Sequence, residues 1–590
     1  MKISLSIPDY LVILVYSIGM LAAGWYFSKN KKDASDYLLG GRSMPWLPVG
    51  LSILMTFFST YSMVMVPGEI YNHGLDLWVM ALINPYVQII SVLIFTRFFF
   101  KINAFTPFEY LAYRYDKYTR LLAAVGNCIG SVLYVGMVLL STAKIFEAAA
   151  GWPCWLTIIL IGGIALIYTS SGGLRAVVWT DSIQFFVMAI GLTVLLFTLC
   201  SEVPGGAIGA VSYAFEHGHG LKRFSEPDFY SVWPYVRITF WVTLLNYVMG
   251  SLGFGTGQMT VQRLLATGSV RKAVKAQCAS SLLTTPLQLV IWFIGLAIFS
   301  YYSQNPDPRV TSGDGALFVF VSTKLPFLIP GLFISAMLAA SMSTLSSCFN
   351  SDAAVWLKEV YLPYFNKKAD DRQQVRFSVR ATIAVGLAGI IFSLLQYLSS
   401  IWFKQTMVEV NVIFGIITVS VGLMNYVFAI FSRKACSLSF WSMLLITWGL
   451  KMPILIWYAG SKRGEIQFQS SGVPGLAGPI SIAWILWPAL LAVLLLLLGL
   501  AIRKKYKYAF MAALPPTGFT LGAILWYIFS HTGDPTLPKV LSFQWVGLPN
   551  LIFSIIFMIA WHLFGPEQPP ERYRGLIWSD LDSDVRKLEA

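Results

Sequence analysis

The residues with the clearest chemical potential form a hydroxyl-rich run inside an apolar segment, "AMLAASMSTLSSCFNS", Ala336 to Ser351. Residues three and four apart share one face of a helix. That face would carry Ala340, Ser343, Thr344 and Ser347, with Ser346 and Ser351 close by. Hydroxyl and carbonyl oxygens are the ligands that a small, hard cation prefers, so the face suits sodium. The alternative is a packing seam of small residues, in which each hydroxyl bonds back to a carbonyl of the preceding turn.

A single acidic residue could complete such a site. Asp181 lies in "GGLRAVVWTDSIQFFVMAIG", about one helical turn into another apolar segment. An acid inside a membrane is costly unless it pairs with a cation or a proton, so Asp181 is a functional candidate. The alternatives are an ion pair with Arg175 or an interfacial position that water reaches.

The composition requires a membrane setting for these residues. The chain has 590 residues, of which 56% are hydrophobic and 12% charged, and its mean hydropathy is +0.67. A water-soluble globule does not tolerate such values, so the sequence predicts an all-α polytopic membrane protein. We predict fifteen spans long enough to cross about 30 Å of hydrocarbon. They lie at 10–27, 46–66, 77–100, 121–143, 153–170, 177–200, 235–257, 277–300, 326–349, 379–400, 408–431, 439–459, 478–501, 509–530 and 543–564.

The positive charges predict the orientation, because cationic loops resist translocation. With the N-terminus outside, the runs "SKNKK", "RKAVK", "NKKADDRQQVR" and "RKKYK" all fall inside. We therefore expect an external N-terminus and a cytoplasmic C-terminus in a plasma or inner cell membrane. The net charge of +14 then reflects topology and does not indicate a nucleic-acid partner.

Other site chemistries find little support in the sequence. The six cysteines are scattered and the five histidines cluster only at "HGH", so no metal site other than sodium and no cofactor is expected. A membrane-embedded transferase would need paired carboxylates or a cluster of His and acidic residues beside a large outer domain. The sequence has neither, so we predict a protein that is not an enzyme. A solute sensor would need an attached signalling domain.

Two segments suggest broken helices. "MTFFSTYSMV" interrupts the second span with polar residues, and "NYVMGSLGFGTGQMTVQR" places four glycines in the last part of the seventh. Broken helices in corresponding places line the binding sites of transporters built from inverted repeats. Five spans separate the two starts, as a five-plus-five repeat requires. The alternative is that the glycines only allow close helix packing.

Several segments together resemble the sodium:solute symporter family, which includes sodium-coupled transporters for glucose, proline, iodide, monocarboxylates and sialic acid. They include "DYLLGGRSMPWLPVGLSIL", "VPGEIYNHGL", "TPFEYLAYRYDKYTR", "YTSSGGLRAVVWTDSIQ", "QMTVQRLLAT" and "LPFLIPGLFISAMLAASMSTLSSCFNSDAA". The resemblance extends over about residues 7–435. It implies a LeuT-like five-plus-five inverted repeat with one leading helix and about four additional C-terminal spans. The expected division is a transporter core at 1–435, additional helices at 436–565 and a cytoplasmic tail at 566–590.

The resemblance also implies site residues. The main sodium site would use the carbonyls of Met55, Phe58 and Ala340 and the hydroxyls of Ser343 and Thr344. A second sodium site, as in some members, would use Asp181, Ser346 and Ser347. Solute would bind beside the unwound segments, where the candidates are Ser59, Thr60, Ser62, Phe254 and Gln258.

The solute stays open at this stage. Gly250 and Gly253 stand where sugar-transporting members place Asn and an aromatic gate, which argues against a glucose-type pocket. The broken-helix segments look closer to the iodide and monocarboxylate branch, yet no intramembrane Arg presents itself as a carboxylate clamp. We predict a sodium-coupled symporter that imports a small organic anion or sugar-like solute by alternating access. The alternative is a proton-coupled or sodium-independent carrier of the same fold, in which Asp181 takes protons.

Overall fold

The computed structural model describes residues 6–28, 33–310, 313–403, 423–467, 488–495, 506–531 and 541–583. All regular structure in these ranges is helical. Within them, eight helices are long and apolar enough to cross a membrane, or nine if one bent pair counts as a span. The prediction of an all-α, multi-pass protein is thereby confirmed. The predicted spans at 408–431 and 478–501 lie mainly outside the described residues, so the total of fifteen stays a prediction.

The chain forms two compact units, each described by itself. The first comprises Met1–Pro107, Cys128–Ser225 and Gly250–Asn411. The second comprises Phe108–Asn127, Glu226–Met249 and Val412–Ala590. These units group residues by contact, whereas the expected division at 435 and 565 concerns function and remains a prediction.

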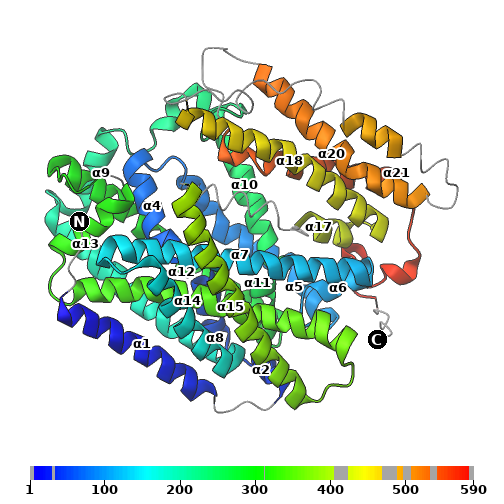
Figure 1. Cartoon of the computed structure of the whole chain (residues 1–590), viewed down its shortest axis with the longest axis horizontal. Coiled ribbons are helices and arrows are strands. Elements are labelled where there is room, and N and C mark those ends of the chain that lie inside the picture. The colour runs from blue at the N-terminus through cyan, green and yellow to red at the C-terminus, as the bar shows by residue number, and fades with distance from the viewer. Residues whose placement is uncertain are drawn as a thin grey trace. The chain divides into compact units, whose positions relative to one another are not determined.

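Helix α14 (Ile329–Val355) is the centre of the first unit. Its most apolar stretch is 94% buried, far more than that of any other long span in the described ranges. It packs against α8 (Cys154–Glu202), α1 (Ile7–Ser28), α15 (Asp371–Phe403) and α3 (Trp46–Phe57). Figure 1 shows α1, α8 and α14 side by side. The hydroxyl face of α14 is therefore enclosed by protein.

Helix α8 contains two of the predicted spans. It is 49 residues long, about 73 Å at 1.5 Å per residue, which is more than one crossing needs. The chain breaks at Gly173, whose φ of 64° is the left-handed conformation that favours glycine. A Cβ there would come within 2.6 Å of the Tyr37 carbonyl oxygen. The predicted spans at 153–170 and 177–200 therefore meet at this glycine.

The first predicted broken helix has the expected form. Helix α3 ends at Phe57, and α4 (Thr60–His73) begins after Phe58 and Ser59, which are both extended. The two helices are bent by 54°. The Phe58 amide still bonds to the Leu54 carbonyl, and the Ser59 carbonyl accepts from the Ser62 amide. The extended pair nevertheless interrupts the ladder between the two helices, so the break leaves polar backbone inside the span.

The glycine-rich segment forms the second break. Helix α10 (Phe240–Gly253) leads into a short 3₁₀ turn at Phe254–Thr256. Gly257 is extended, and α11 (Gln258–Ala266) follows. Gly255 also permits close packing, because a Cβ there would lie 2.7 Å from the Ser91 hydroxyl. The helix is discontinuous as predicted, and Gly255 allows close packing in addition.

The remaining helices of the first unit cover these elements. The long ones are α5 (Asn84–Lys101), most of α7 (Lys117–Ala150) and α12 (Val270–Gln304). The short ones include α2 (Ala34–Leu39), α9 (Gly206–Glu216), α13 (Gly313–Lys324) and a π-helix at Trp356–Phe365 that continues α14. Helix α12 packs on α3, α4 and α5 and so closes one side of the first break.

The second unit is built around α18 (Ser437–Gln467) and α20 (Tyr506–His531), with α21 (Leu548–Phe564) and α17 (Leu423–Phe431) (Figure 1). Helices α18 and α20 touch through glycines: a Cβ on Gly449 would lie 2.0 Å from the Pro515 carbonyl oxygen. Leu576 and Ile577 of the tail are buried. The Tyr110 hydroxyl of α6 (Phe108–Arg114) donates to the Leu576 carbonyl at 2.6 Å, so this part of the tail is packed against the unit.

Candidate functional site

The hydroxyl face of α14 meets the broken end of α3. The Thr344 hydroxyl lies 3.1 Å from the Thr56 carbonyl oxygen and 3.2 Å from that of Ala340. Carbonyls in the last turn of a helix lack intrahelical amide partners. Thr56 and Met55 both belong to that turn of α3. The structure thus brings one α14 hydroxyl, that of Thr344, to a carbonyl in the last turn of α3.

The five residues of the predicted main sodium site are all buried. Met55, Ala340, Ser343 and Thr344 are each 0% exposed, and Phe58 is 7% exposed. Met55 precedes the Thr56 carbonyl that Thr344 contacts, and Phe58 is the first residue after α3. The back-bonding alternative also occurs, because the Ser347 hydroxyl donates to the Ser343 carbonyl at 2.7 Å.

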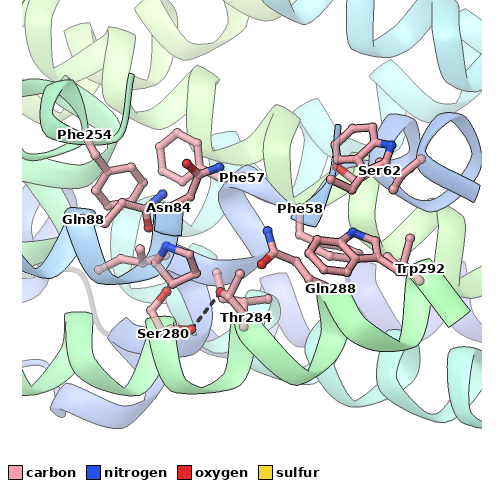
Figure 2. A pocket seen from close by; sticks show the side chains of 16 residues that line it. Phe57, Phe58, Ser62, Asn84, Gln88, Phe254, Ser280, Thr284, Gln288 and Trp292 are labelled. Carbon is pink, nitrogen blue, oxygen red and sulfur yellow. Dashed lines mark hydrogen bonds between the residues drawn. The ribbon is translucent and has the colours of Figure 1, made fainter. Parts of the chain in front are cut away.

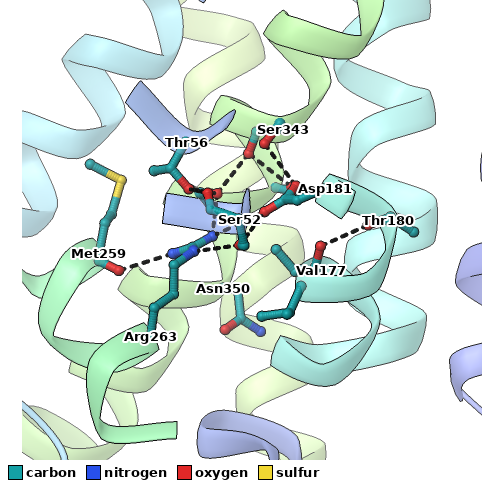
Figure 3. Close-up of polar contacts among 12 residues, drawn as sticks. Ser52, Thr56, Val177, Thr180, Asp181, Met259, Arg263, Ser343 and Asn350 are labelled. Atoms are coloured by element: carbon teal, nitrogen blue, oxygen red, sulfur yellow. Dashed lines mark hydrogen bonds and ion pairs between the residues drawn. The ribbon is translucent and has the colours of Figure 1, made fainter. Parts of the chain in front are cut away.

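Asp181 lies at the centre of a buried polar network (Figure 3). The Ser52 hydroxyl donates to its Oδ2 at 2.5 Å, and the Ser343 hydroxyl donates to its Oδ1 at 2.7 Å. The guanidinium of Arg263 lies 3.6 Å from Oδ2. Both members of this ion pair are buried, at 0% and 1% side-chain exposure. The carboxylate is therefore compensated by an arginine and two hydroxyls.

Arg263 connects the residues of this network, and the sequence did not reveal its role. It belongs to α11, directly after the second break. Its Nε donates to Ser52 Oγ at 2.8 Å, its Nη1 donates to the Met259 carbonyl at 3.0 Å, and its Nη2 donates to the Ser347 hydroxyl. One side chain thus connects α11 with both α3 and α14.

The alternative partner for Asp181 was wrong. Arg175 pairs instead with Asp36 at 2.9 Å, and its side chain is 34% exposed. Asp181 itself is fully buried, so the interfacial alternative is wrong as well. The segment "QMTVQRLLAT" contains the signal that could have identified Arg263 as the partner. An arginine that closely follows a helix break can direct its side chain back toward that break.

The residues of the predicted second sodium site surround Ser343. Asp181 accepts from the Ser343 hydroxyl, while the Ser346 and Ser347 hydroxyls both donate to the Ser343 carbonyl, at 3.0 and 2.7 Å. Ser347 also contacts the Thr56 hydroxyl at 2.9 Å. In this conformation Arg263 supplies the positive charge beside Asp181 and Ser347. Ser346 and Ser347 thus bond to the carbonyl of Ser343, and the hydroxyl of Ser343 links this turn of α14 to Asp181.

A cavity of about 220 Å³ adjoins the first break, where Phe57, Phe58 and Ser62 line it (Figure 2). It is enclosed by α3, α4, α5, α12 and the turn at Phe254–Thr256. Two of the five predicted solute residues, Ser62 and Phe254, line it. The Phe57 and Phe254 rings lie 4.7 Å apart between their centroids. The polar groups missed by the sequence analysis are Asn84, Gln88, Ser280, Thr284 and Gln288.

The other three solute candidates lie outside this lining. The Thr60 hydroxyl donates to the Met337 carbonyl at 2.8 Å and contacts Ser341, so it joins α4 to α14. Ser59 is 6% exposed. Gln258 is 2% exposed, and neither of its side-chain polar atoms has a hydrogen-bond partner among the described residues.

Comparisons with known proteins place the chain in context. The sequence model of the sodium:solute symporter family matches residues 37–445. A sodium-dependent multivitamin transporter from Oryctolagus cuniculus is 32% identical over 396 residues, which are 65% of this chain and 60% of that protein. The sodium/sialic acid symporter NanT from Aliivibrio fischeri is 28% identical over 404 residues, which are 67% of this chain and 78% of that protein.

A solved structure shares the fold. It is the substrate-bound, outward-open state of a Na⁺-coupled sialic acid symporter, and it matches with a TM-score of 0.66 and 22% identity. The match covers 88% of this chain and 98% of that one. The LeuT-like architecture that the family resemblance implied is confirmed by this likeness. The family match covers well over half of the sequence, and the chain therefore belongs to the sodium:solute symporter family, a family of multi-pass membrane transporters.

Proposed function

We propose that this chain is a sodium-coupled symporter that imports a small organic solute by alternating access. The observation that carries the proposal is the contact between Thr344 of α14 and the Thr56 carbonyl at the end of α3. It brings neutral oxygens of α14 and of the broken end of α3 together, which is the setting in which transporters of this architecture hold their coupling ions.

In the main sodium site, the carbonyls of Met55, Phe58 and Ala340 and the hydroxyls of Ser343 and Thr344 would hold the ion. These groups come from two elements, so a bound cation adds an attraction between α3 and α14. The state in which they lie close together is then favoured by sodium, because a ligand shifts an equilibrium toward the conformation it binds better. We propose that this state is open to the outside.

A second sodium ion would bind at Asp181, Ser346 and Ser347. Arg263 already neutralises Asp181 in the present conformation, so a cation at this place requires the guanidinium to withdraw. Each additional charge moved through about 100 mV would contribute about 2.3 kcal/mol to transport. The number of sodium ions transported per cycle, one or two, thus depends on whether Arg263 moves away from Asp181 during the cycle.

The cavity beside the first break is the proposed solute site, with Ser62 and Phe254 as its predicted members. The sixteen residues that line it, all in described parts of the chain, are uncharged. Carboxamides and hydroxyls offer both donors and acceptors, and aromatic rings offer flat apolar faces. Of the two predicted classes, organic anion and sugar-like, this lining favours a sugar-like, neutral solute. Ser59 and Thr60 lie at the first helix break and Gln258 at the second. These three residues would then stabilise the broken helices and would not contact the solute.

The proposal includes an orientation in the membrane and a division of the chain into functional parts. The distribution of basic loops supports an external N-terminus and a cytoplasmic C-terminus in a plasma or inner cell membrane. Residues 1–435 would form the transporting core, 436–565 the additional helices and 566–590 the tail. The activity proposed is transport, with Na⁺ as the coupling ion and no further cofactor, rather than catalysis.

The test is the thermal stability of the detergent-purified protein in sodium, compared with equimolar potassium and choline. Sodium at about a hundredfold excess over its dissociation constant should stabilise the folded state by about 2.7 kcal/mol. Ser343→Ala should abolish this shift. Ser335→Ala is the matched control, because Ser335 is a buried serine of the same helix that bonds to the Gly331 carbonyl, two turns before the site.

The alternative is a proton-coupled or sodium-independent carrier of the same fold. No sodium-specific shift at any concentration, in a protein that unfolds cooperatively, would contradict sodium coupling. The same unfolding experiment in a pH series, with Asp181→Asn beside the wild type, would then test proton coupling at Asp181.

A further inference from the structure

A second buried acid, Asp352 of α14, has none of the partners that Asp181 of α8 has. The Asp352 side chain is 0% exposed. Neither carboxyl oxygen has a hydrogen-bond partner in the described parts of the chain, and no Lys, Arg or His of those parts lies within ion-pair distance of it. Asp9, another buried acid, accepts bonds from the Gly331 amide and from Ser6. Asp352 is thus an exception among the buried carboxyls described in this unit.

Its position separates it from the sodium face. Asp352 lies nine residues beyond Ser343, which is two and a half helical turns, or about 13 Å along the axis. Because the spacing is two full turns and one half turn, the side chains of Ser343 and Asp352 point to opposite sides of α14. Asp352 therefore belongs to neither of the predicted sodium sites.

The groups that surround Asp352 are weakly polar. The Cys128 thiol and the Ser131 hydroxyl of α7 face it, and the Cys348 thiol lies one turn earlier on α14. The Ser131 hydroxyl is itself buried without a partner among the described residues. The carboxyl of Glu359, on the π-helix that continues α14, accepts a bond from Thr106. None of these groups supplies a positive charge.

An apolar cluster adjoins the site. Cys348 and Phe349 pack with Val135 of α7 and with Val385 and Ile390 of α15. In such surroundings an ionised carboxylate without a cation costs far more than a neutral carboxylic acid. Acids held inside a membrane protein pair with a cation or carry a proton. With no cation at hand, the proton is the remaining ligand.

We propose that Asp352 is a proton-binding site, occupied in this conformation, and that it exchanges its proton when the contact between α7 and α14 opens. The step is a simple dissociation: the O–H bond of the carboxylic acid breaks, its electron pair stays on Asp352, and the proton passes to water that enters between the helices. A proton would then move with the conformational cycle in addition to the coupling sodium. Occupancy of Asp352 by a proton does not depend on the sodium sites, whereas its exchange rests on the proposed sodium-coupled cycle.

Infrared difference spectroscopy of the full-length purified protein tests occupancy directly, because a protonated carboxyl has a carbonyl stretching band that a carboxylate lacks. The band should persist above about pH 7, where an ordinary Asp is ionised. It should be absent in Asp352→Asn and retained in Asp9→Asn, the matched control. A spectrum that Asp352→Asn leaves unchanged would overturn the proposal, provided that the variant unfolds at a temperature close to that of the wild type.

Exchange is tested by replacing sodium with choline at constant ionic strength, in the wild type and in Ser343→Ala. If proton release follows the conformational change, the Asp352 band should lose amplitude when sodium is withdrawn from the wild type. A band that is present but insensitive to sodium, in a protein that sodium stabilises thermally, would refute exchange and leave a permanently neutral Asp352. In Asp352→Glu the band should return at a shifted frequency, which separates proton binding from a packing effect.

Discussion

The Arg263 guanidinium lies 3.6 Å from the Asp181 carboxylate in a part of the molecule that water does not reach. The pair joins α11, which follows one helix break, to α8, and through Ser52 to α3, which precedes the other. In low-dielectric surroundings such a pair is retained only where hydrogen bonds satisfy both members, as Ser52, Ser343 and Ser347 do here. Both breaks therefore converge on one charged network.

Asp181→Asn should destabilise the protein strongly, because it leaves the buried Arg263 without a counter-charge. Removal of one partner of a buried pair costs about 3–5 kcal/mol. Asp181→Asn combined with Arg263→Gln should recover part of that loss, since neither charge then remains. The measurement is thermal unfolding of the three variants in detergent without sodium. Additive losses in the double variant would show that the two residues are not coupled.

Thr344→Val should weaken sodium binding while preserving the shape of the side chain. The substitution removes the hydroxyl that contacts the Thr56 carbonyl, and a hydrogen-bonding group that serves an ion is worth about 1.5–3 kcal/mol, or roughly a tenfold to hundredfold change in affinity. Sodium titrations of thermal stability measure the effect. Thr180→Val is the control, because the hydroxyl of Thr180, also buried, bonds to the Ala176 and Val177 carbonyls of its own helix. Equal sodium affinities in both variants would remove Thr344 from the site.

The sequence predicted the elements that depend on local pattern. The hydroxyls of α14 recur with helical spacing, so their common face could be recognised from 340 to 347. The breaks at Phe58 and Gly257 follow from polar residues and glycines in otherwise apolar spans. These signals lie within about ten neighbouring residues, and packing between distant helices does not change them.

Contacts between distant segments could not be predicted in the same way. Arg263 lies in a short segment whose direction depends on the turn at Phe254–Thr256, so its approach to Asp181 is a tertiary effect. Gln88 and Gln288 stand singly on long apolar helices, where one polar residue has no characteristic spacing. Only the packing of α5 and α12 around the broken helix brings them to one cavity.

Gln288→Leu should impair solute binding without affecting sodium. Its Oε1 lies in the cavity region without a hydrogen-bond partner among the described residues, so it is available to a solute. Loss of one such bond should raise the KM for sodium-driven uptake about tenfold, since about 1.4 kcal/mol corresponds to that factor. Uptake of a panel of labelled neutral sugars and organic anions into proteoliposomes measures the effect. The sodium-induced thermal shift should stay unchanged, and its loss would indicate a structural defect instead.

His219 should make the stability of the protein depend on pH in mildly acidic solution. It lies in the loop after α9, where its ring stacks on Phe299 at 3.5 Å between centroids, and burial lowers its pKa from 6.5. The unfolded chain therefore binds a proton more readily than the folded one. The stabilisation is fully present above about pH 6.5 and is lost as the pH falls through the range below it.

Thermal unfolding of the wild type and His219→Gln between about pH 5 and about pH 8 measures this contribution. The variant should show a smaller decline in unfolding temperature toward acid pH, because the group that takes up the proton in the unfolded state is gone. His217→Gln serves as the control, because that ring lies two residues earlier and stacks on Tyr213 of α9. A decline of the same size in His219→Gln would show that burial against Phe299 does not exclude the proton.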